Sequence, residues 1–191
     1  MHGQGFTVFA SAIGPCGIAW GPRGVIGVQL PEQTEKATRE RMRRRYPEAV
    51  EAPPPPGVRQ AIDNVVGLLL GEIRDLSDVA LDMDGIPPFC QRLYAVLREI
   101  PAGATLSYGA LAARLGEACT ARDVGEAMGN NPFPIIVPCH RVVGAGGKVG
   151  GFSAPGGVAT KLRMLNIEKA RLGEAPTLFD DLPLSVRGRR G

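Results

Sequence analysis

A cysteine, a histidine and an arginine follow one another at the end of an apolar run, as Cys139, His140 and Arg141, with Pro138 before them and a glycine-rich loop after them. A thiol reacts as its thiolate, and a nearby base or cation favours that form. Cys139 is therefore a candidate nucleophile. The alternative is a buried structural thiol, and this local pattern does not by itself decide between the two.

The other cysteines and histidines limit the remaining chemistry. Cys16, Cys90 and Cys119 have no neighbours that would activate a thiol, so we expect them to be structural. The sequence has no CxxC pair and only two histidines, which predicts no metal site. Adjacent residues seldom point the same way, so Cys139 and His140 do not match the direct pair of a cysteine hydrolase.

The composition permits one large domain or two small ones. The chain has 191 residues, of which 44% are hydrophobic, so it can bury a substantial core. Its net charge of +3 is too mild to indicate a nucleic-acid partner. We interpret the arginines of residues 39–45 as a solvated helix face and those of 187–190 as a chain end. Neither a signal peptide nor a membrane span is predicted, so we expect a cytoplasmic protein with reduced thiols.

The first third of the chain predicts a sheet covered by helices. Residues 6–11, 16–20 and 25–30 are apolar runs separated by glycine and proline turns, which indicates a small antiparallel sheet. A polar surface helix is expected over 31–46. A second helix over 58–70 has its apolar residues on one face, and this face would cover the sheet.

A connector separates two predicted domains. Residues 76–88 carry several aspartates, a glycine and two prolines, which are poor residues for continuing a helix. We therefore place a boundary at residue 85. Residues 1–85 would form a structural sheet-and-helix domain, 86–172 would carry the candidate nucleophile, and 173–191 would be a tail.

Helical patterns dominate the second domain. A helix is predicted over residues 89–100 and another over 108–115. A third helix begins with a capping box made by Thr120 and Asp123. The last two helices, joined by a short turn, predict a helix-turn-helix, with an ordinary helical hairpin as the alternative. The apolar run at 133–137 is predicted to be a strand.

One face of the third helix has an unusual composition. Arg122, Gly125 and Gly129 lie together opposite the apolar stripe. Glycine inside a helix costs about 1 kcal/mol relative to alanine, so two glycines on one face suggest that another backbone approaches closely. A DNA strand would fit that description.

Several motifs of the second domain occur together in one known family. They are Tyr108, Arg122, Asn131-Pro132, the Pro-Cys-His-Arg run at 138–141, the loop at 150–153, and residues 161–168. Over residues 86–170 the chain resembles the O6-alkylguanine-DNA alkyltransferases, also called methylated-DNA–protein-cysteine methyltransferases. Towards the N-terminus the resemblance is limited to the order of a sheet followed by helices.

The resemblance implies DNA repair by direct reversal of damage. Members of the family move the alkyl group of O6-alkylguanine, mainly O6-methylguanine, irreversibly onto their own cysteine, so each molecule acts once. O4-methylthymine is a second candidate substrate. Cys139 would be the acceptor, in an α/β protein of the α+β type. The partner would be double-stranded DNA with the damaged base flipped out, and the protein would be a monomer without cofactor or obligate protein partner.

The resemblance also implies catalytic roles beside Cys139. A water would pass the thiol proton to His140, and Glu168 would orient the imidazole and stabilise its charged form. The hydroxyl of Tyr108 would donate to the guanine ring as negative charge develops there.

Further roles concern the DNA and the guanine pocket. Arg122 would take the place of the flipped base, with Ala121 and Gly125 beside it on the DNA. Asn131 would tie together the turns that hold Cys139. The pocket and its support would include Met128, Val142, Phe152, Ser153, Pro138 and Arg141. Asp123 and Glu126 place negative charge on a helix that is expected to lie against phosphates, so they should lower DNA affinity. Asp123 also fits a helix cap.

Two rival functions share the predicted helix-turn-helix. Alkyltransferase-like proteins bind the same lesion but lack the acceptor cysteine, so Cys139 argues against a lesion sensor. A transcription regulator that senses alkylation would carry further metal-binding and regulatory domains, for which this chain has no room.

Overall fold

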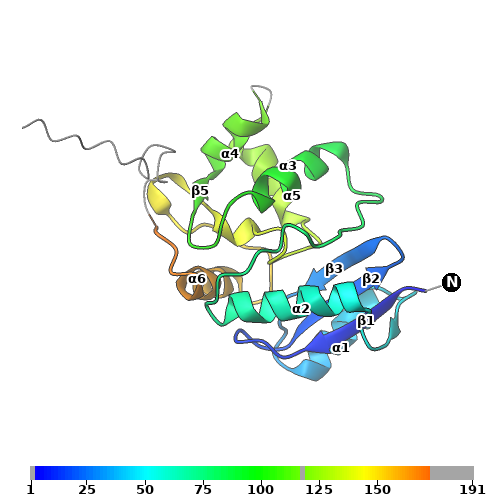
Figure 1. The fold of residues 1–191 in the computed structure, drawn as a ribbon. Helices are drawn as coiled ribbons and strands as arrows, with labels where there is room; N and C mark the ends of the chain where they lie inside the picture. The colour runs from blue at the N-terminus through cyan, green and yellow to red at the C-terminus, as the bar shows by residue number, and fades with distance from the viewer. Residues whose placement is uncertain (1–2, 117–118, 173–191) are drawn as a thin grey trace, which may run out of the picture.

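Two groups of elements make up the molecule, a sheet with its helices and a helical cluster (Figure 1). The structure is a computed structural model that describes residues 3–116 and 119–172. The predicted tail at 173–191 lies outside the described residues. Sheet and helices occur in the α+β arrangement expected from the sequence.

The sheet has three antiparallel strands and one parallel addition. The predicted antiparallel strands are confirmed as β1 (Gly5–Phe9), β2 (Cys16–Gly21) and β3 (Gly24–Gln29). A fourth strand, β4 (Val50–Glu51), pairs in parallel with β1, so the order is β3-β2-β1-β4 and the sheet is mixed rather than purely antiparallel. The sequence did not predict β4, because two exposed residues carry no alternating pattern.

Helices lie on both faces of this sheet. α1 (Glu35–Arg45) packs on one face, where Met42 meets Ala19 of β2. α2 (Pro56–Leu69) belongs to the core on the other face, together with Ile18. Side chains of a strand alternate between its faces, so β2 supplies both layers. The two helices expected near these positions are confirmed.

The C-terminal part is mainly helical. Its helices are α3 (Pro88–Arg98), α4 (Tyr108–Leu115), α5 (Ala121–Gly129) and α6 (Gly157–Ile167). Short elements complete it, namely the parallel strands β5 (Leu106–Ser107) and β6 (Val142–Val143) and the 3-10 turns η1 (Cys139–Arg141) and η2 (Ala145–Gly147). The predicted capping box of Thr120 and Asp123 is present at the start of α5. α4 and α5 pack together as expected of a helix-turn-helix.

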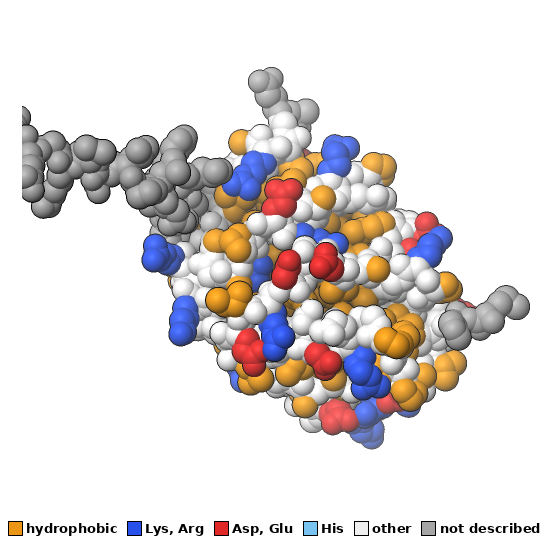
Figure 2. Space-filling model, viewed as in Figure 1, with side chains coloured by type: hydrophobic (Ala, Val, Ile, Leu, Met, Phe, Trp, Pro, Cys, Tyr) orange, Lys and Arg blue, Asp and Glu red, His pale blue; other side chains and the backbone are white. Residues whose placement is uncertain are grey.

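Charged side chains are distributed over the surface. On the face shown in Figure 2, basic and acidic side chains of the described residues are interspersed with hydrophobic ones. None of the described helices has the length and apolar composition needed to span a bilayer.

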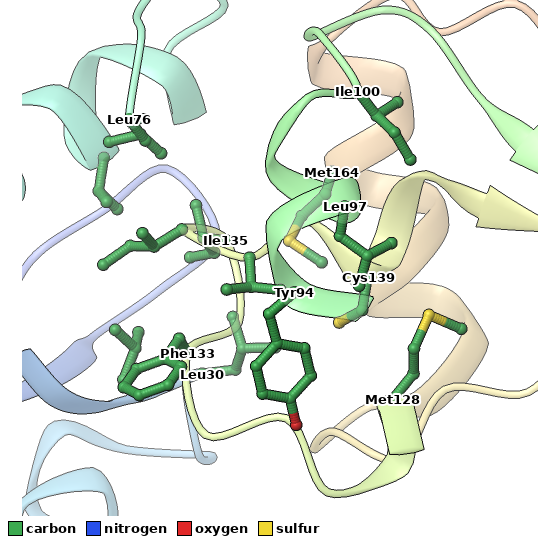
Figure 3. Close-up of a cluster of buried hydrophobic side chains, with 14 of the residues drawn as sticks. Leu30, Leu76, Tyr94, Leu97, Ile100, Met128, Phe133, Ile135, Cys139 and Met164 are labelled. Carbon is green, nitrogen blue, oxygen red and sulfur yellow. The ribbon is translucent and has the colours of Figure 1, made fainter. Parts of the chain in front are cut away.

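A single buried cluster joins the two groups of elements. Leu30, which follows β3, belongs to the same cluster as Phe133 and Cys139 (Figure 3). The amide of Val28 also donates to the carbonyl of Pro132 at 2.8 Å. The sheet therefore holds the segment that leads to Cys139.

Candidate active site

Cys139 follows a tight buried turn, so the predicted strand at residues 133–137 is wrong. The amide of Val137 donates to the carbonyl of Phe133 at 2.8 Å, and Ile135 has a positive φ of 75°. Such a backbone conformation is strained for a β-branched residue. The run is apolar because the turn is buried, and periodicity cannot distinguish a short buried turn from a buried strand.

The side chain of Asn131 bridges the two ends of this turn. Its Oδ1 accepts from the amide of Phe133 at 2.9 Å, and its Nδ2 donates to the carbonyl of Val137 at 3.0 Å. Both groups would otherwise be buried without a partner, which costs about 1–3 kcal/mol each. Asn131 therefore fixes the backbone from which Cys139 projects.

The thiol of Cys139 lies at the edge of the core. Only 6% of the residue is exposed, and Figure 3 shows its sulfur among apolar side chains near Leu97, with Met128 on the neighbouring helix. Burial raises the pKa of Cys139, while Asn131 and the charge of Lys161 act in the opposite direction. The resting cysteine is therefore a protonated thiol at neutral pH.

His140 and Arg141, which follow Cys139 in η1, share one carboxylate. Nε2 of His140 lies 3.0 Å from Oε1 of Glu168. The guanidinium of Arg141 donates from Nη2 to Oε1 at 2.7 Å and from Nε to Oε2 at 2.9 Å. Burial would raise the pKa of Glu168, but the hydrogen bonds from His140 and Arg141 outweigh it and hold the pKa at about 2. Glu168 is therefore ionised.

The ionised carboxylate fixes the tautomer of His140. A carboxylate only accepts hydrogen bonds, so Nε2 carries the proton and donates it to Glu168. Nδ1 is then the basic nitrogen, and it is buried with no hydrogen-bond partner among the described residues. Burial lowers the pKa of His140, while Glu168 opposes this. The imidazole is thus neutral at rest and can accept a proton at Nδ1.

Lys161 begins the 161–168 motif of the resemblance, and the structure makes it a functional candidate to which the sequence had given no role. It is completely buried on α6, and its Nζ donates to the carbonyl of Val142 at 2.6 Å. The same ammonium lies 5.8 Å from the centroid of the Tyr108 ring. The available signal was a lysine on the same helix face as the apolar Met164 and Leu165, since a lysine is almost never fully buried without a specific partner.

A cleft of about 360 Å³ opens onto the thiol. Among the sequence-predicted residues, Cys139, Tyr108, Gly125, Met128, Asn131, Phe152 and Ser153 line it. The others do not line it, namely Ala121, Arg122, Pro138, His140, Arg141, Val142 and Glu168. Val142 is buried, with its carbonyl bound to Lys161, so it supports the cleft instead of forming its wall.

The exposed surface of α5 forms one rim of this cleft. Arg122 has 87% of its side chain exposed and pairs with Glu126 at 3.0 Å. Asp123 accepts from the amide and hydroxyl of Thr120 at 2.8 and 2.6 Å, so its carboxylate serves the helix cap. A Cβ added at Gly125 would make only an ordinary contact with neighbouring protein atoms. Internal packing therefore does not require glycine there, which leaves room for an external backbone.

The chain is similar to known proteins over most of its length. The family described as 6-O-methylguanine DNA methyltransferase, DNA binding domain, matches residues 88–170. A Mycobacterium tuberculosis protein called methylated-DNA–protein-cysteine methyltransferase is 38% identical over 175 residues, which cover 92% of this chain and 98% of the relative. A Thermus thermophilus protein called DNA base-flipping protein is 42% identical over 113 residues, which cover 59% of this chain and 72% of that protein.

A solved structure extends the likeness to the fold. The crystal structure of Mycobacterium tuberculosis OGT in complex with DNA superimposes with a TM-score of 0.66 at 36% identity, covering 86% of this chain and 92% of that one. The thiol at the cleft, the carboxylate shared by His140 and Arg141, and the likeness over nearly the whole length lead to one conclusion. The chain belongs to the methylated-DNA–protein-cysteine methyltransferase family.

Proposed function

We propose that this protein repairs O6-alkylguanine in double-stranded DNA by taking the alkyl group irreversibly onto Cys139, once per molecule. The observation that carries the proposal is a cleft whose described lining includes one thiol, that of the buried Cys139, together with the glycine face of α5. His140, the next residue in the chain, is paired with Glu168. O6-methylguanine is the main substrate in this proposal, and O4-methylthymine is a second one.

The proposed reaction is a displacement at the alkyl carbon. The Cys139 thiol gives its proton, through a water, to Nδ1 of His140. The thiolate then attacks the carbon, so that a sulfur–carbon bond forms while the bond from carbon to guanine O6 breaks and its electron pair stays on the guanine. The hydroxyl of Tyr108 donates to the ring where this negative charge gathers. No step regenerates the thiol, so the protein is consumed.

Proton transfer is costly in a buried site, and charged neighbours reduce that cost. Burial raises the pKa of Cys139 and lowers that of His140, which favours the neutral pair. The carboxylate of Glu168 stabilises the imidazolium that forms, and the ammonium of Lys161 stabilises the thiolate. Each ion of the reactive pair is thus stabilised by a charged group that is already in place.

Base flipping brings the lesion from the helix stack to the thiol. A base within the stack cannot reach a buried sulfur, and extruding it costs a few kcal/mol, least for a damaged and weakly paired base. Arg122 fills the vacated place, for which it must leave Glu126. An exposed ion pair four residues apart on a helix is worth only about 0.3–0.5 kcal/mol, so this release is inexpensive.

A lesion sensor without transferase activity is the alternative function. It is favoured by the relative that is called a DNA base-flipping protein. The position of Cys139 in the lining of the cleft favours transfer, because a sensor has no need for a thiol there.

The fate of the damaged base separates the two functions. Increasing amounts of protein are mixed with a duplex that contains one O6-methylguanine, and the DNA is then digested to nucleosides. We expect guanine to replace O6-methylguanine mole for mole with the added protein, and Cys139→Ser to leave the lesion intact. DNA that is bound but still carries the full amount of O6-methylguanine would support the sensor.

We also propose that the protein acts as a monomer in the cytoplasm. All four cysteines are unpaired, and a reducing compartment keeps the acceptor thiol available. Sedimentation at micromolar concentration should give the mass of one chain. A mass that rises with concentration would contradict the monomer.

A further inference from the structure

The arginine-rich helix α1 has two different basic faces. Arg39 and Arg43 lie one turn apart and both pair with Glu51, at 2.8 and 3.0 Å. Arg41 and Arg45 are also one turn apart, on a different side of the helix. Both of these arginines line the cleft that contains Cys139. The run is therefore more than the solvated helix face expected from the sequence.

Arg41 and Arg45 give the cleft its positive charge. Among the described residues that line it, they are the only charged ones. Nη1 of Arg45 donates to the carbonyl of Val28 at 3.3 Å, and its guanidinium carbon lies 5.4 Å from the ring centroid of Tyr46. Both partners are uncharged, so Arg45 is held at the cleft while its charge stays available.

The rim formed by α5 does not provide such a charge. Its cation, Arg122, is paired with Glu126, and Asp123 adds a further negative charge. DNA affinity depends largely on cations that neutralise phosphates, so the helix that should lie along the DNA contributes little by this route. A second source of positive charge beside the same cleft would supply what α5 lacks.

We propose that Arg41 and Arg45 bind backbone phosphates of the strand whose flipped nucleotide enters the cleft, an inference that rests on the proposed function. A flipped base carries its sugar and flanking phosphates with it, so phosphates come close to the mouth of any cleft that accepts the base. A guanidinium binds phosphate with paired N–H donors, and phosphate contacts fix the register of a protein on DNA. The N-terminal sheet domain is thereby a part of the substrate site.

Salt dependence of binding tests the proposed phosphate contacts. Arg41→Gln and Arg45→Gln are compared with Arg44→Gln, an exposed arginine of the same helix outside the cleft lining. All are made in a Cys139→Ser background, so that binding of a duplex with one O6-methylguanine stays at equilibrium. Each cleft variant should lower the slope of log K against log salt by about 0.9 and weaken binding roughly tenfold at 0.1 M salt, because each loses one phosphate contact. Arg44→Gln should do neither.

Transfer from the free base O6-methylguanine, which has no phosphate, separates this proposal from the function on which it rests. With Cys139 restored, Arg44→Gln should accept methyl from the free base and from DNA at the parental rates, while Arg41→Gln and Arg45→Gln should lose far more rate with DNA than with the free base. Slopes equal to that of Arg44→Gln would overturn the phosphate role. An equal loss of transfer rate with the free base and with DNA would also overturn it, since the arginines would then act through the fold. If the parental protein accepts methyl from neither substrate, the proposed function itself fails.

Discussion

Tyr108 is the residue whose proposed role depends most directly on one atom. Burial raises the pKa of its phenol, so the hydroxyl keeps its proton throughout the neutral range and can donate to the guanine. Tyr108→Phe removes the donor and keeps the ring. We expect the single-turnover rate at saturating DNA to fall roughly 100-fold, as when one donor to a developing negative charge is removed, with DNA affinity near that of the parent. An unchanged rate would exclude the donor role.

Glu168 links the chemistry of the site to stability. Its pKa is about 2 in the folded protein against an ordinary value of 4.5, so it stabilises the fold fully above pH 4.5 and loses this effect as the pH falls towards 2. This lowering of the Glu168 pKa on folding corresponds to about 3 kcal/mol in the free energy of unfolding. In urea unfolding, Glu168→Gln should be less stable at pH 7 by at least this amount, because Arg141 also loses its buried partner.

The pH profile of the variant adds a second criterion. Between pH 4.5 and 2 the stability of Glu168→Gln should vary less than that of the parent. Glu126→Gln, which removes an exposed carboxylate, is the control and should change the free energy of unfolding by less than about 0.5 kcal/mol. Parallel profiles for Glu168→Gln and the parent would contradict the assignment of a low pKa to Glu168.

At the scale of elements, α5 depends on its cap. The hydroxyl of Thr120 accepts from the amide of Asp123 at 3.2 Å, and the carboxylate of Asp123 accepts from the amide of Thr120 at 2.8 Å. Thr120→Ala should lower the free energy of unfolding by about 1 kcal/mol and weaken DNA binding, since this helix borders the cleft. Thr120→Ser keeps the hydroxyl and should retain most of the stability. Equal losses in both variants would mean that the cap does not hold the helix.

Elements with local signals were predictable from the sequence, and elements held by distant contacts were not. The capping box of α5 depends only on Thr120 and Asp123, which are three residues apart, so the sequence predicts it. The turn before Cys139 depends on both ends of the Asn131 amide and on burial under Leu30 and Tyr94, which no local pattern contains. The apolar run alone therefore predicts a strand.

The same limit applies to the candidate site. The residues around Cys139 were found because they form a continuous motif. The pairing of Glu168 with His140 was expected from the family resemblance, whereas the bonds of Glu168 to Arg141 follow only when α6 is packed against η1. Arg41 enters the cleft only through the placement of α1 on the sheet. Lys161 was visible as a charge among apolar positions of a helix, but its partner Val142 was not.

At the scale of the whole molecule, a shared core should make the two proposed domains unfold together. Leu30 is 1% exposed and packs in the cluster that contains Cys139. Leu30→Ala should cost about 2–5 kcal/mol, whereas Val50→Ala, at a residue that is 70% exposed, should have little effect. The fluorescence of Trp20 and the capacity for methyl transfer should be lost at the same urea concentration. Separate midpoints would instead indicate two independent domains divided near residue 85.

In the proposed reaction Cys139 accepts one alkyl group from DNA and keeps it. The most direct measurement is the intact mass of the protein, followed by peptide mapping, after reaction with a slight excess of duplex that carries one O6-methylguanine. We expect one methyl in place of one hydrogen on the peptide containing Cys139, never more than one per molecule, and none in Cys139→Ala. Unchanged mass despite DNA binding, or a methyl group on another residue, would contradict it.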